Sequence, residues 1–143
     1  MRALGYLLGI GSLLLGMFLG GEFDFFIDVP TLVIVPGGGI AFALAAHGKP
    51  LWRALAAGLF EMAVEADEEA RLIQILQTLR TTLIGIGIAY AFLGGINISA
   101  GLDDWSSFGP GFAVLLLGPF YGVVLAELLV APAMNRLELK LLS

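Results

Sequence analysis

Four long apolar stretches divide the chain and constrain its fold more than any other feature. A helix needs about 17–25 apolar residues to cross a hydrocarbon layer about 30 Å thick. Residues 3–20, 31–47, 82–98 and 108–130 meet this requirement. Residues 48–81 are the one substantial polar segment between them. The pattern predicts an all-α, polytopic membrane protein with four transmembrane helices and a short cytoplasmic helical extension at 48–81.

The supply of charged residues supports a membrane protein and argues against a soluble enzyme. Only 13% of the 143 residues are charged and 59% are hydrophobic, whereas soluble domains carry about 25% charged residues. The length predicts a single membrane domain over residues 1–143. There is no Cys and only one His, His47, so we expect no metal site, and no set of residues forms a catalytic, cofactor or nucleic-acid site.

The placement of the basic residues predicts the orientation. They occur at the two ends of the chain and in segment 48–81: Arg2, Lys49, Arg53, Arg71, Arg80, Arg136 and Lys140. The charged residues of the other two loops are all acidic: Glu22, Asp24, Asp28, Asp103 and Asp104. Because Lys and Arg are retained in the cytoplasm, both termini are expected to be cytoplasmic, in a bacterial inner membrane. A signal peptide is the alternative for residues 3–20, but this run is long and Leu19-Gly20-Gly21 is a poor cleavage site.

The polar segment is predicted to form two helices that extend the neighbouring spans. Acidic residues at 67–69 are favourable at a helix N-terminus, and an apolar face follows at helical spacing: Leu72, Ile73, Leu76 and Leu79. We expect this helix to continue through Arg80 into the third span. Residues 50–66 are expected to form a second, antiparallel helix. A pair of about this size, roughly 33 residues, is shorter than a typical domain.

Small residues recur on one side of two spans and predict close helix packing. In the first span they are Gly5, Gly9, Ser12, Gly16 and Gly20, and in the fourth they are Gly118, Gly122 and Ala126. Packing within one subunit and packing between subunits explain these stripes equally well. Several such faces on four short helices favour a homo-oligomer.

Two segments resemble the MotA/TolQ/ExbB proton channel superfamily. Residues 26–38, Phe-Ile-Asp-Val-Pro-Thr-Leu-Val-Ile-Val-Pro-Gly-Gly, are similar to the end of the first loop and the start of the second helix in MotA-type proteins. Residues 108–117 and 121–126, followed by Ala131-Pro132 and Leu137-Glu138, resemble that family's fourth helix. The start of the third span, Leu83-Ile84-Gly85, is similar more loosely. The chain thus looks like a divergent, short member.

The resemblance implies an inner-membrane ring subunit. Members form pentamers around transmembrane helices of a single-span B-type partner and couple ion flow to mechanical work. Their third and fourth helices line the inside of the ring, which would make Gly85, Gly118, Tyr121 and Gly122 inner-face positions here. The lipid bilayer, further copies of the chain and a B-type subunit are therefore the expected partners.

The chain departs from the family's pattern where hydroxyl side chains help to pass the ion. Gly85-Ile86 stands where the family has Gly-Thr, and Gly118-Pro119 stands where a Thr pair usually precedes Tyr-Gly. Neither Ile nor Pro offers a side-chain oxygen. Pro119 would kink the fourth helix and free the carbonyl of Leu115. A non-conducting scaffold with the same architecture is therefore the alternative function, and the long cytoplasmic insertion of a flagellar stator is absent.

Glu127 is the one ionisable residue inside a predicted span. It is a candidate ion-path residue, as a proton relay or an ion-vestibule ligand, and the alternative is a neutral or paired group at a subunit contact near the interface. A small stand-alone channel built around Glu127 is a third hypothesis. His47 reads as a boundary residue, and Gly37-Gly38-Gly39 as a close-packing site. The acidic cluster is interpreted as a solvated helix-capping face, with cation binding as the alternative: Glu61, Glu65, Asp67, Glu68 and Glu69.

Overall fold

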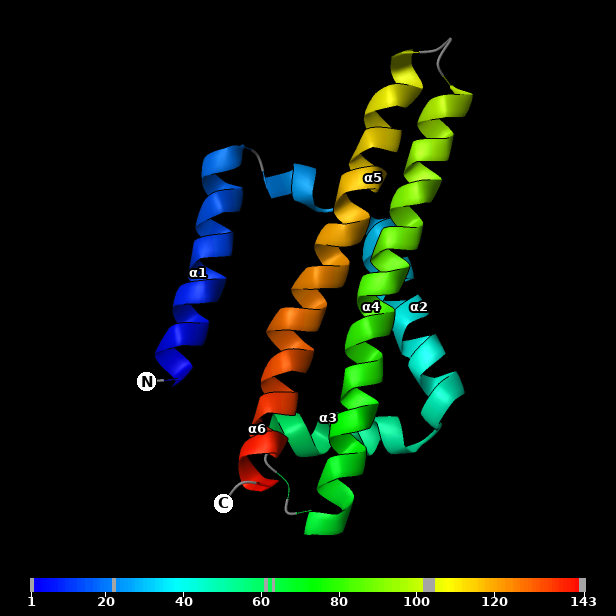
Figure 1. Cartoon of the computed structure of the whole chain (residues 1–143). Coiled ribbons are helices and arrows are strands. Elements are labelled where there is room, and N and C mark those ends of the chain that lie inside the picture. Colours follow the sequence, from blue (N-terminus) through cyan, green and yellow to red (C-terminus); the bar gives the residue numbers. More distant parts are fainter. Residues whose placement is uncertain (1, 22, 61, 63, 102–104, 142–143) are drawn as a thin grey trace.

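The computed structural model describes residues 2–21, 23–60, 62, 64–101 and 105–141, and every regular element in these ranges is helical (Figure 1). The elements are α1 (Arg2–Gly20), the 3-10 helix η1 (Phe23–Phe26), α2 (Val29–His47), α3 (Pro50–Phe60), α4 (Ala66–Ala100), α5 (Trp105–Leu125), the π-helical η2 (Ala126–Val130) and α6 (Ala131–Leu141). The expected all-α class is confirmed. Of the acidic residues discussed above, Glu22, Glu61, Asp103 and Asp104 lie outside the described residues.

Three helical stretches of the described chain are long and apolar enough to cross a membrane: Val29–His47, Asp67–Ala100 and Phe108–Lys140. They indicate a membrane-embedded protein. The first expected span is a shorter apolar helix, Leu4–Gly20, which rises only about 25 Å at 1.5 Å per residue. Three of the four expected spans are therefore present as membrane-length helices.

The long helix predicted from the acidic residues at 67–69 is confirmed. α4 begins at Ala66, passes Arg80 without a break and ends at Ala100. Its 35 residues give a length of about 52 Å, which exceeds a hydrocarbon layer of about 30 Å. The helix thus joins a polar lower part to an apolar upper part.

Glycines set the distance between α4 and α5, which lie side by side over most of their length (Figure 1). A Cβ added at Gly87 would lie 2.5 Å from the carbonyl oxygen of Gly118, and one added at Gly94 would lie 2.6 Å from the backbone nitrogen of Leu115. On α5, a Cβ at Gly122 would lie 2.7 Å from the carbonyl oxygen of Leu83. The two backbones therefore touch directly, a contact that only glycine permits.

The start of α2 is held by side chains from both ends of the chain. Asp28 is its N-cap and accepts a hydrogen bond of 2.9 Å from the backbone nitrogen of Thr31 and another from the Thr31 hydroxyl. The Tyr121 hydroxyl of α5 donates to the carbonyl oxygen of Phe26 and accepts from the backbone nitrogen of Asp28 at 3.2 Å. These bonds fasten η1 and α2 to α5.

The helix expected at 50–66 is shorter than predicted and is oriented differently. α3 ends at Phe60 and lies across the bundle (Figure 1), where it packs on α4 and α6. The reason is its buried face, Leu51, Ala54, Ala57 and Gly58, in which a Cβ at Gly58 would lie 2.7 Å from the Cβ of Ala133. Small residues on this face favour a close crossing over alignment beside α4.

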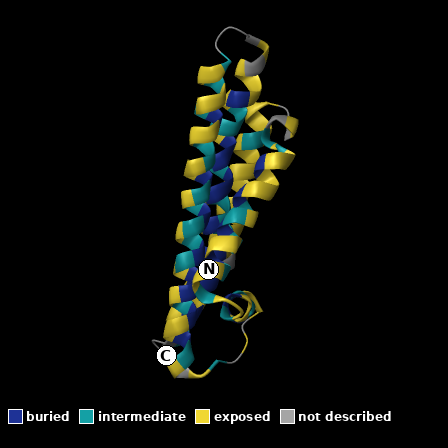
Figure 2. Ribbon diagram, turned by 90° about the vertical axis from the view of Figure 1, so that its right-hand side faces the viewer, coloured by how far each residue is buried: buried dark blue, intermediate teal, exposed yellow. Residues whose placement is uncertain are grey.

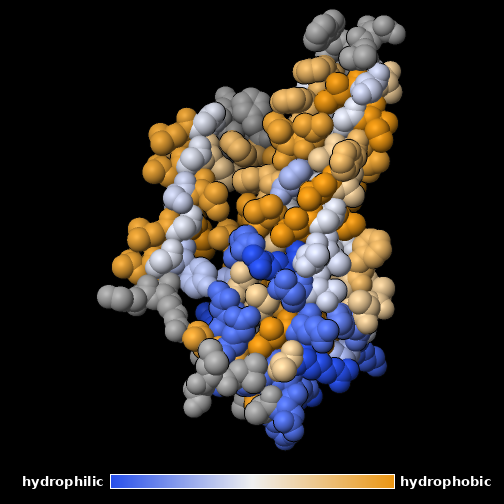
Figure 3. All heavy atoms as spheres, in the orientation of Figure 1, coloured by the Kyte–Doolittle hydropathy of each residue, from blue (hydrophilic) through white to orange (hydrophobic). Residues whose placement is uncertain are grey.

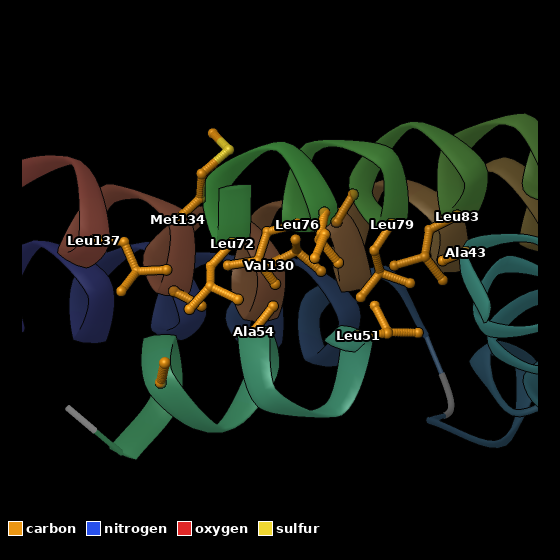
Figure 4. Close-up of a cluster of buried hydrophobic side chains, with 14 residues drawn as sticks. Ala43, Leu51, Ala54, Leu72, Leu76, Leu79, Leu83, Val130, Met134 and Leu137 are labelled. Carbon is orange, nitrogen blue, oxygen red and sulfur yellow. The ribbon is translucent and has the colours of Figure 1, made fainter. Parts of the chain in front are cut away.

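The main core lies where α3 crosses the lower parts of α4 and α6. Figure 4 shows Leu72, Leu76 and Leu79 of α4 facing Val130 and Leu137, with the α3 side chains below them, and all five of these α4, η2 and α6 residues are buried. The predicted apolar face at Leu72, Leu76 and Leu79 is confirmed. Ile75 is buried as well, while Ile73 is only partly buried.

Buried residues follow the contacts among α2, α4 and α5 (Figure 2). α1 differs, because its residues from Leu4 to Gly20 are exposed except for the partly buried Met17. An apolar cleft of about 240 Å³ separates it from α2 and α5, with Ile10 on one side and Val124 on the other. Most of the apolar surface of α1 is therefore not buried against the rest of the described chain.

Candidate ion-path and packing site

Glu127 forms an ion pair with Arg80, a residue 47 positions earlier in the chain. The Arg80 Nη2 and Nε atoms lie 2.6 and 3.0 Å from Glu127 Oε1, so one carboxylate oxygen accepts both hydrogen bonds. The side chains remain 31% and 43% exposed. The carboxylate is therefore neutralised by a neighbour, yet the pair stays accessible from one side of the molecule.

A π-turn presents Glu127 to Arg80. Within η2 the backbone nitrogen of Ala131 donates to the carbonyl oxygen of Ala126, five residues back. Pro132 follows, and because its ring cannot donate a hydrogen bond and crowds the carbonyl four residues earlier, a widened turn is favoured here. π-turns of this kind are frequent at functional sites. The sequence signal was Pro132 itself, which sits inside an otherwise continuous apolar helix.

The ion pair lies just inside the lower end of the α2 span. His47, the last residue of α2, places Nε2 2.9 Å from Oγ1 of Thr78. Arg80 is two residues further along α4, which is about 3 Å toward the apolar part. His47 is thus the last residue of one candidate span, whereas Thr78 lies inside the Asp67–Ala100 stretch, so the contact marks the depth at which α2 ends beside α4.

One side of α4 beside this pair is open and partly polar. A cleft of about 330 Å³ is lined by Arg80, Thr81 and Gly85, and a second cleft of about 290 Å³, lined by Thr81, Thr82 and Gly85, flanks it. A Cβ at Gly85 would meet nothing within 4 Å. The hydroxyl of Thr82 donates to the carbonyl oxygen of Gly39 in α2, whereas Thr81 is exposed. We refer to Gln77, Thr81, Gly85 and Ile88 as the open face of α4.

The other candidate inner-face residues are used inside the chain. Gly118 and Gly122 are buried against α4, and Tyr121, 8% exposed, holds the η1 turn. Of the four positions that the resemblance implied, only Gly85 remains open in a single copy. Pro119 lies within α5, which continues past it to Leu125.

The two small-residue stripes have different roles in the structure. In the fourth span, Ala126 is fully buried in the main core, and with Gly118 and Gly122 it packs within the chain. In the first span the stripe is open, because a Cβ at Gly5, Gly9 or Gly16 would meet nothing within 4 Å. Ser12 bonds only to Gly9 of its own helix, and Gly20 approaches Phe26. No stripe residue lines the cleft beside α1.

The glycine and acidic clusters each divide between two environments. A Cβ at Gly39 would lie 2.6 Å from Leu83 and one at Gly38 3.1 Å from Ile86, so these two glycines pack on α4, but Gly37 is open.

Among the acidic residues, Glu68 pairs with Arg53 at 2.7 Å. Glu69 is only 5% exposed, so the prediction of a uniformly solvated face was wrong at this residue. No group of three metal-binding side chains forms among the described residues.

Three further glycines at the contact between α4 and α5 were not predicted as packing residues: Gly87, Gly94 and Gly111. Their signal was present as a seven-residue spacing, Gly87 to Gly94 on one helix and Gly111 to Gly118 on the other. Seven residues make two helical turns, so each pair lies on one side of its helix. A paired Glu127 is one of the two expected alternatives, but the sequence does not predict that its partner is Arg80 of the same chain.

Comparisons with protein-family models and with curated proteins found no match to this chain.

Proposed function

We propose that the protein is an integral membrane ring subunit of the MotA/TolQ/ExbB type, which assembles with further copies of itself around a transmembrane helix of a partner. The proposal rests on the resemblance at residues 26–38, 108–117 and 121–126 together with one structural observation, the open face of α4. Its expected location is a bacterial inner membrane with both termini in the cytoplasm. Five copies are expected if the assembly follows the family.

The open face of α4 supports a protein neighbour over lipid. It combines an exposed amide at Gln77, an exposed Thr81 whose hydroxyl donates to the Gln77 carbonyl oxygen of the same helix, and a glycine at Gly85. Arg80 lines the same cleft, and Glu127 is paired with Arg80; both side chains are partly exposed. Gln77 lies level with the boundary that His47 and Thr78 mark, and Arg80 and Thr81 lie just inside it, where polar and charged groups are unfavourable against hydrocarbon. Gly85 lies further in, and small residues allow another helix to approach closely. A helix from a second polypeptide satisfies both requirements.

A non-conducting scaffold is the second candidate, and the Arg80–Glu127 pair favours it. A carboxylate already bound by a guanidinium at 2.6 Å is poorly placed to exchange protons with a relay. Ile86 and Pro119 provide no hydroxyl along the family's usual route. In this case the chain would assemble in the membrane without a second polypeptide.

Particles extracted from the native membrane with their lipids would separate these candidates by electron microscopy and native mass spectrometry. The ring proposal expects copies of the chain around helical density that belongs to a different polypeptide. A lipid-filled centre or an open filament would support the scaffold and contradict the ring proposal. A purified protein that conducts protons alone in liposomes, and stops when Glu127→Gln is introduced, would instead support a stand-alone channel.

Gly85→Leu tests the open face directly. Its side chain would enter open space in the single copy, so the fold should remain while recovery of the partner falls at least severalfold. Gly37→Leu is the matched control, because Gly37 is also open and exposed but lies on α2. Equal partner recovery with both variants would show that the open face of α4 is not the contact surface.

A further inference from the structure

One end of the molecule is hydrophilic (Figure 3). Basic side chains from two segments of the chain line a cleft there. Lys49, in the turn that precedes α3, Arg53 of α3 and Arg71 of α4 line this cleft, whose volume is about 320 Å³. Glu68 is the one acidic residue in its wall. We refer to Lys49, Arg53, Glu68 and Arg71 as the basic cleft.

The basic cleft retains an excess of positive charge after its internal pairing. Arg53 Nη2 lies 2.7 Å from Glu68 Oε2, which neutralises one of its three cations and leaves a net charge of +2. Lys49 and Arg71 are exposed and form no ion pair with any residue that the structure describes. Two cations on different elements thus point to an anionic ligand from outside the described chain.

The position of the basic cleft along the helices corresponds to the headgroup layer of a bilayer. Lys49 comes two residues after His47, where the α2 span ends. Thr78 of α4 is level with His47 through their 2.9 Å contact, and Arg71 lies seven residues before Thr78, about 10 Å further out. Long basic side chains at this depth reach phosphate groups.

α3 gives the basic cleft an apolar border suited to a lipid. It lies across the bundle (Figure 1), and it exposes Trp52 by 53%, Leu59 by 38% and Phe60 by 78%. Amphipathic helices of this kind rest in the interfacial layer, with aromatic and aliphatic side chains toward the acyl chains. A lipid whose headgroup enters the basic cleft could place its acyl chains along these residues.

We propose that the basic cleft binds the phosphate of an anionic phospholipid, with Lys49 and Arg71 as the principal contacts and Arg53 held in place by Glu68. Basic pockets between helices at the membrane boundary bind such headgroups. The inference requires only that the protein is embedded in a membrane. It holds for a ring subunit and for a scaffold alike, so its failure would leave the proposed function unaffected.

Trp52 provides the measurement. The sequence has two Trp residues, so Trp105→Phe leaves Trp52 as the only indole, and this parent variant is placed in nanodiscs of phosphatidylcholine with a minor fraction of phosphatidylglycerol. Bromine on the acyl chains of one lipid at a time quenches Trp52 according to which lipid lies beside it. Brominated phosphatidylglycerol should quench Trp52 well beyond its share of the lipid. Quenching in proportion to that share would overturn the proposal.

Lys49→Gln and Arg71→Gln should each lower the preference of the Trp52 site for phosphatidylglycerol about fivefold. This is the factor that the attraction of one basic residue to an anionic membrane surface corresponds to. Glu68→Gln should raise it, because Arg53 is then free for the lipid. A Lys49→Arg, Arg71→Lys double variant keeps the charge and should keep the preference; a loss there would contradict the proposal. Inorganic phosphate added to discs of phosphatidylcholine should leave Trp52 emission unchanged, and a saturable change abolished by Arg71→Gln would overturn the lipid assignment.

Discussion

At the scale of the residue, the contact between α4 and α5 depends on the absence of side chains. Gly87 and Gly118 face each other so closely that a Cβ added to either glycine would lie within 2.7 Å of the carbonyl oxygen of the other. Backbone contact of this kind provides dispersion and Cα–H interactions that replace the hydrophobic drive missing in lipid. Gly85, two positions before Gly87, has open space around it.

Gly87→Ala should therefore destabilise the protein, whereas Gly85→Ala should leave its stability unchanged or slightly raised. The obstacle at Gly87 is backbone, which cannot rotate away, and overpacking of this kind typically costs about 1–3 kcal/mol. Unfolding of both variants by titrated detergent in mixed micelles would measure the difference. Equal stability of the two variants would mean that the helices do not approach as the structure has them.

At the scale of the element, α2 shows how a local signal and a long-range contact act together. Asp28-Val29-Pro30-Thr31 is a helix start that can be read from the sequence, because Asp caps a helix and Pro is tolerated in its first turn. Tyr121, which bonds to Asp28 and Phe26 in the same turn, lies 93 and 95 positions after them in the chain. The cap starts the helix, and Tyr121 places it against α5.

Asp28→Ala should lower the free energy of unfolding by about 1 kcal/mol, the usual effect of losing an N-cap. The Thr31 backbone nitrogen would lose its acceptor, so its amide hydrogen should also exchange faster. Asp24→Ala is the matched control, because Asp24 lies in η1 and its side chain caps no helix in the described chain. Faster exchange at Thr31 in both variants would indicate general loosening of the loop instead.

At the scale of the whole molecule, α2 and α5 run opposite to α4, and α3 and α6 lie together at one end (Figure 1). Hydrophilic atoms gather at that end (Figure 3). The chain contains no Cys, so a single introduced Cys is the only thiol that can be labelled. Its labelling shows on which side of the membrane that position lies. The orientation derived from the basic residues can thus be tested without removing a native thiol.

In intact cells, an impermeant maleimide should label Asp24→Cys, but should label Arg2→Cys and Lys49→Cys only after the membrane is permeabilised. This outcome requires α1 and α2 each to cross the bilayer. Labelling of Arg2→Cys and Asp24→Cys from the same side would show that α1, whose apolar part is about 25 Å long, does not span. Labelling of Lys49→Cys in intact cells would reverse the predicted orientation.

The sequence by itself determined what local composition and periodicity control. The apolar stretches predicted the all-α class and four spans, of which three are membrane-length helices in the structure. The acidic residues at 67–69 predicted where α4 begins. Hydrophobic length and capping are properties of neighbouring residues, so no tertiary information is needed.

Only the tertiary structure decided which groups share a surface. It paired Glu127 with Arg80 and grouped Lys49 with Arg71, and it turned one glycine stripe inward while the other stayed open. Each of these outcomes depends on how helices far apart in the chain are rotated and shifted against one another. Small residues permit close packing but do not select the partner, and charges attract without specifying which pair the backbone will bring within reach.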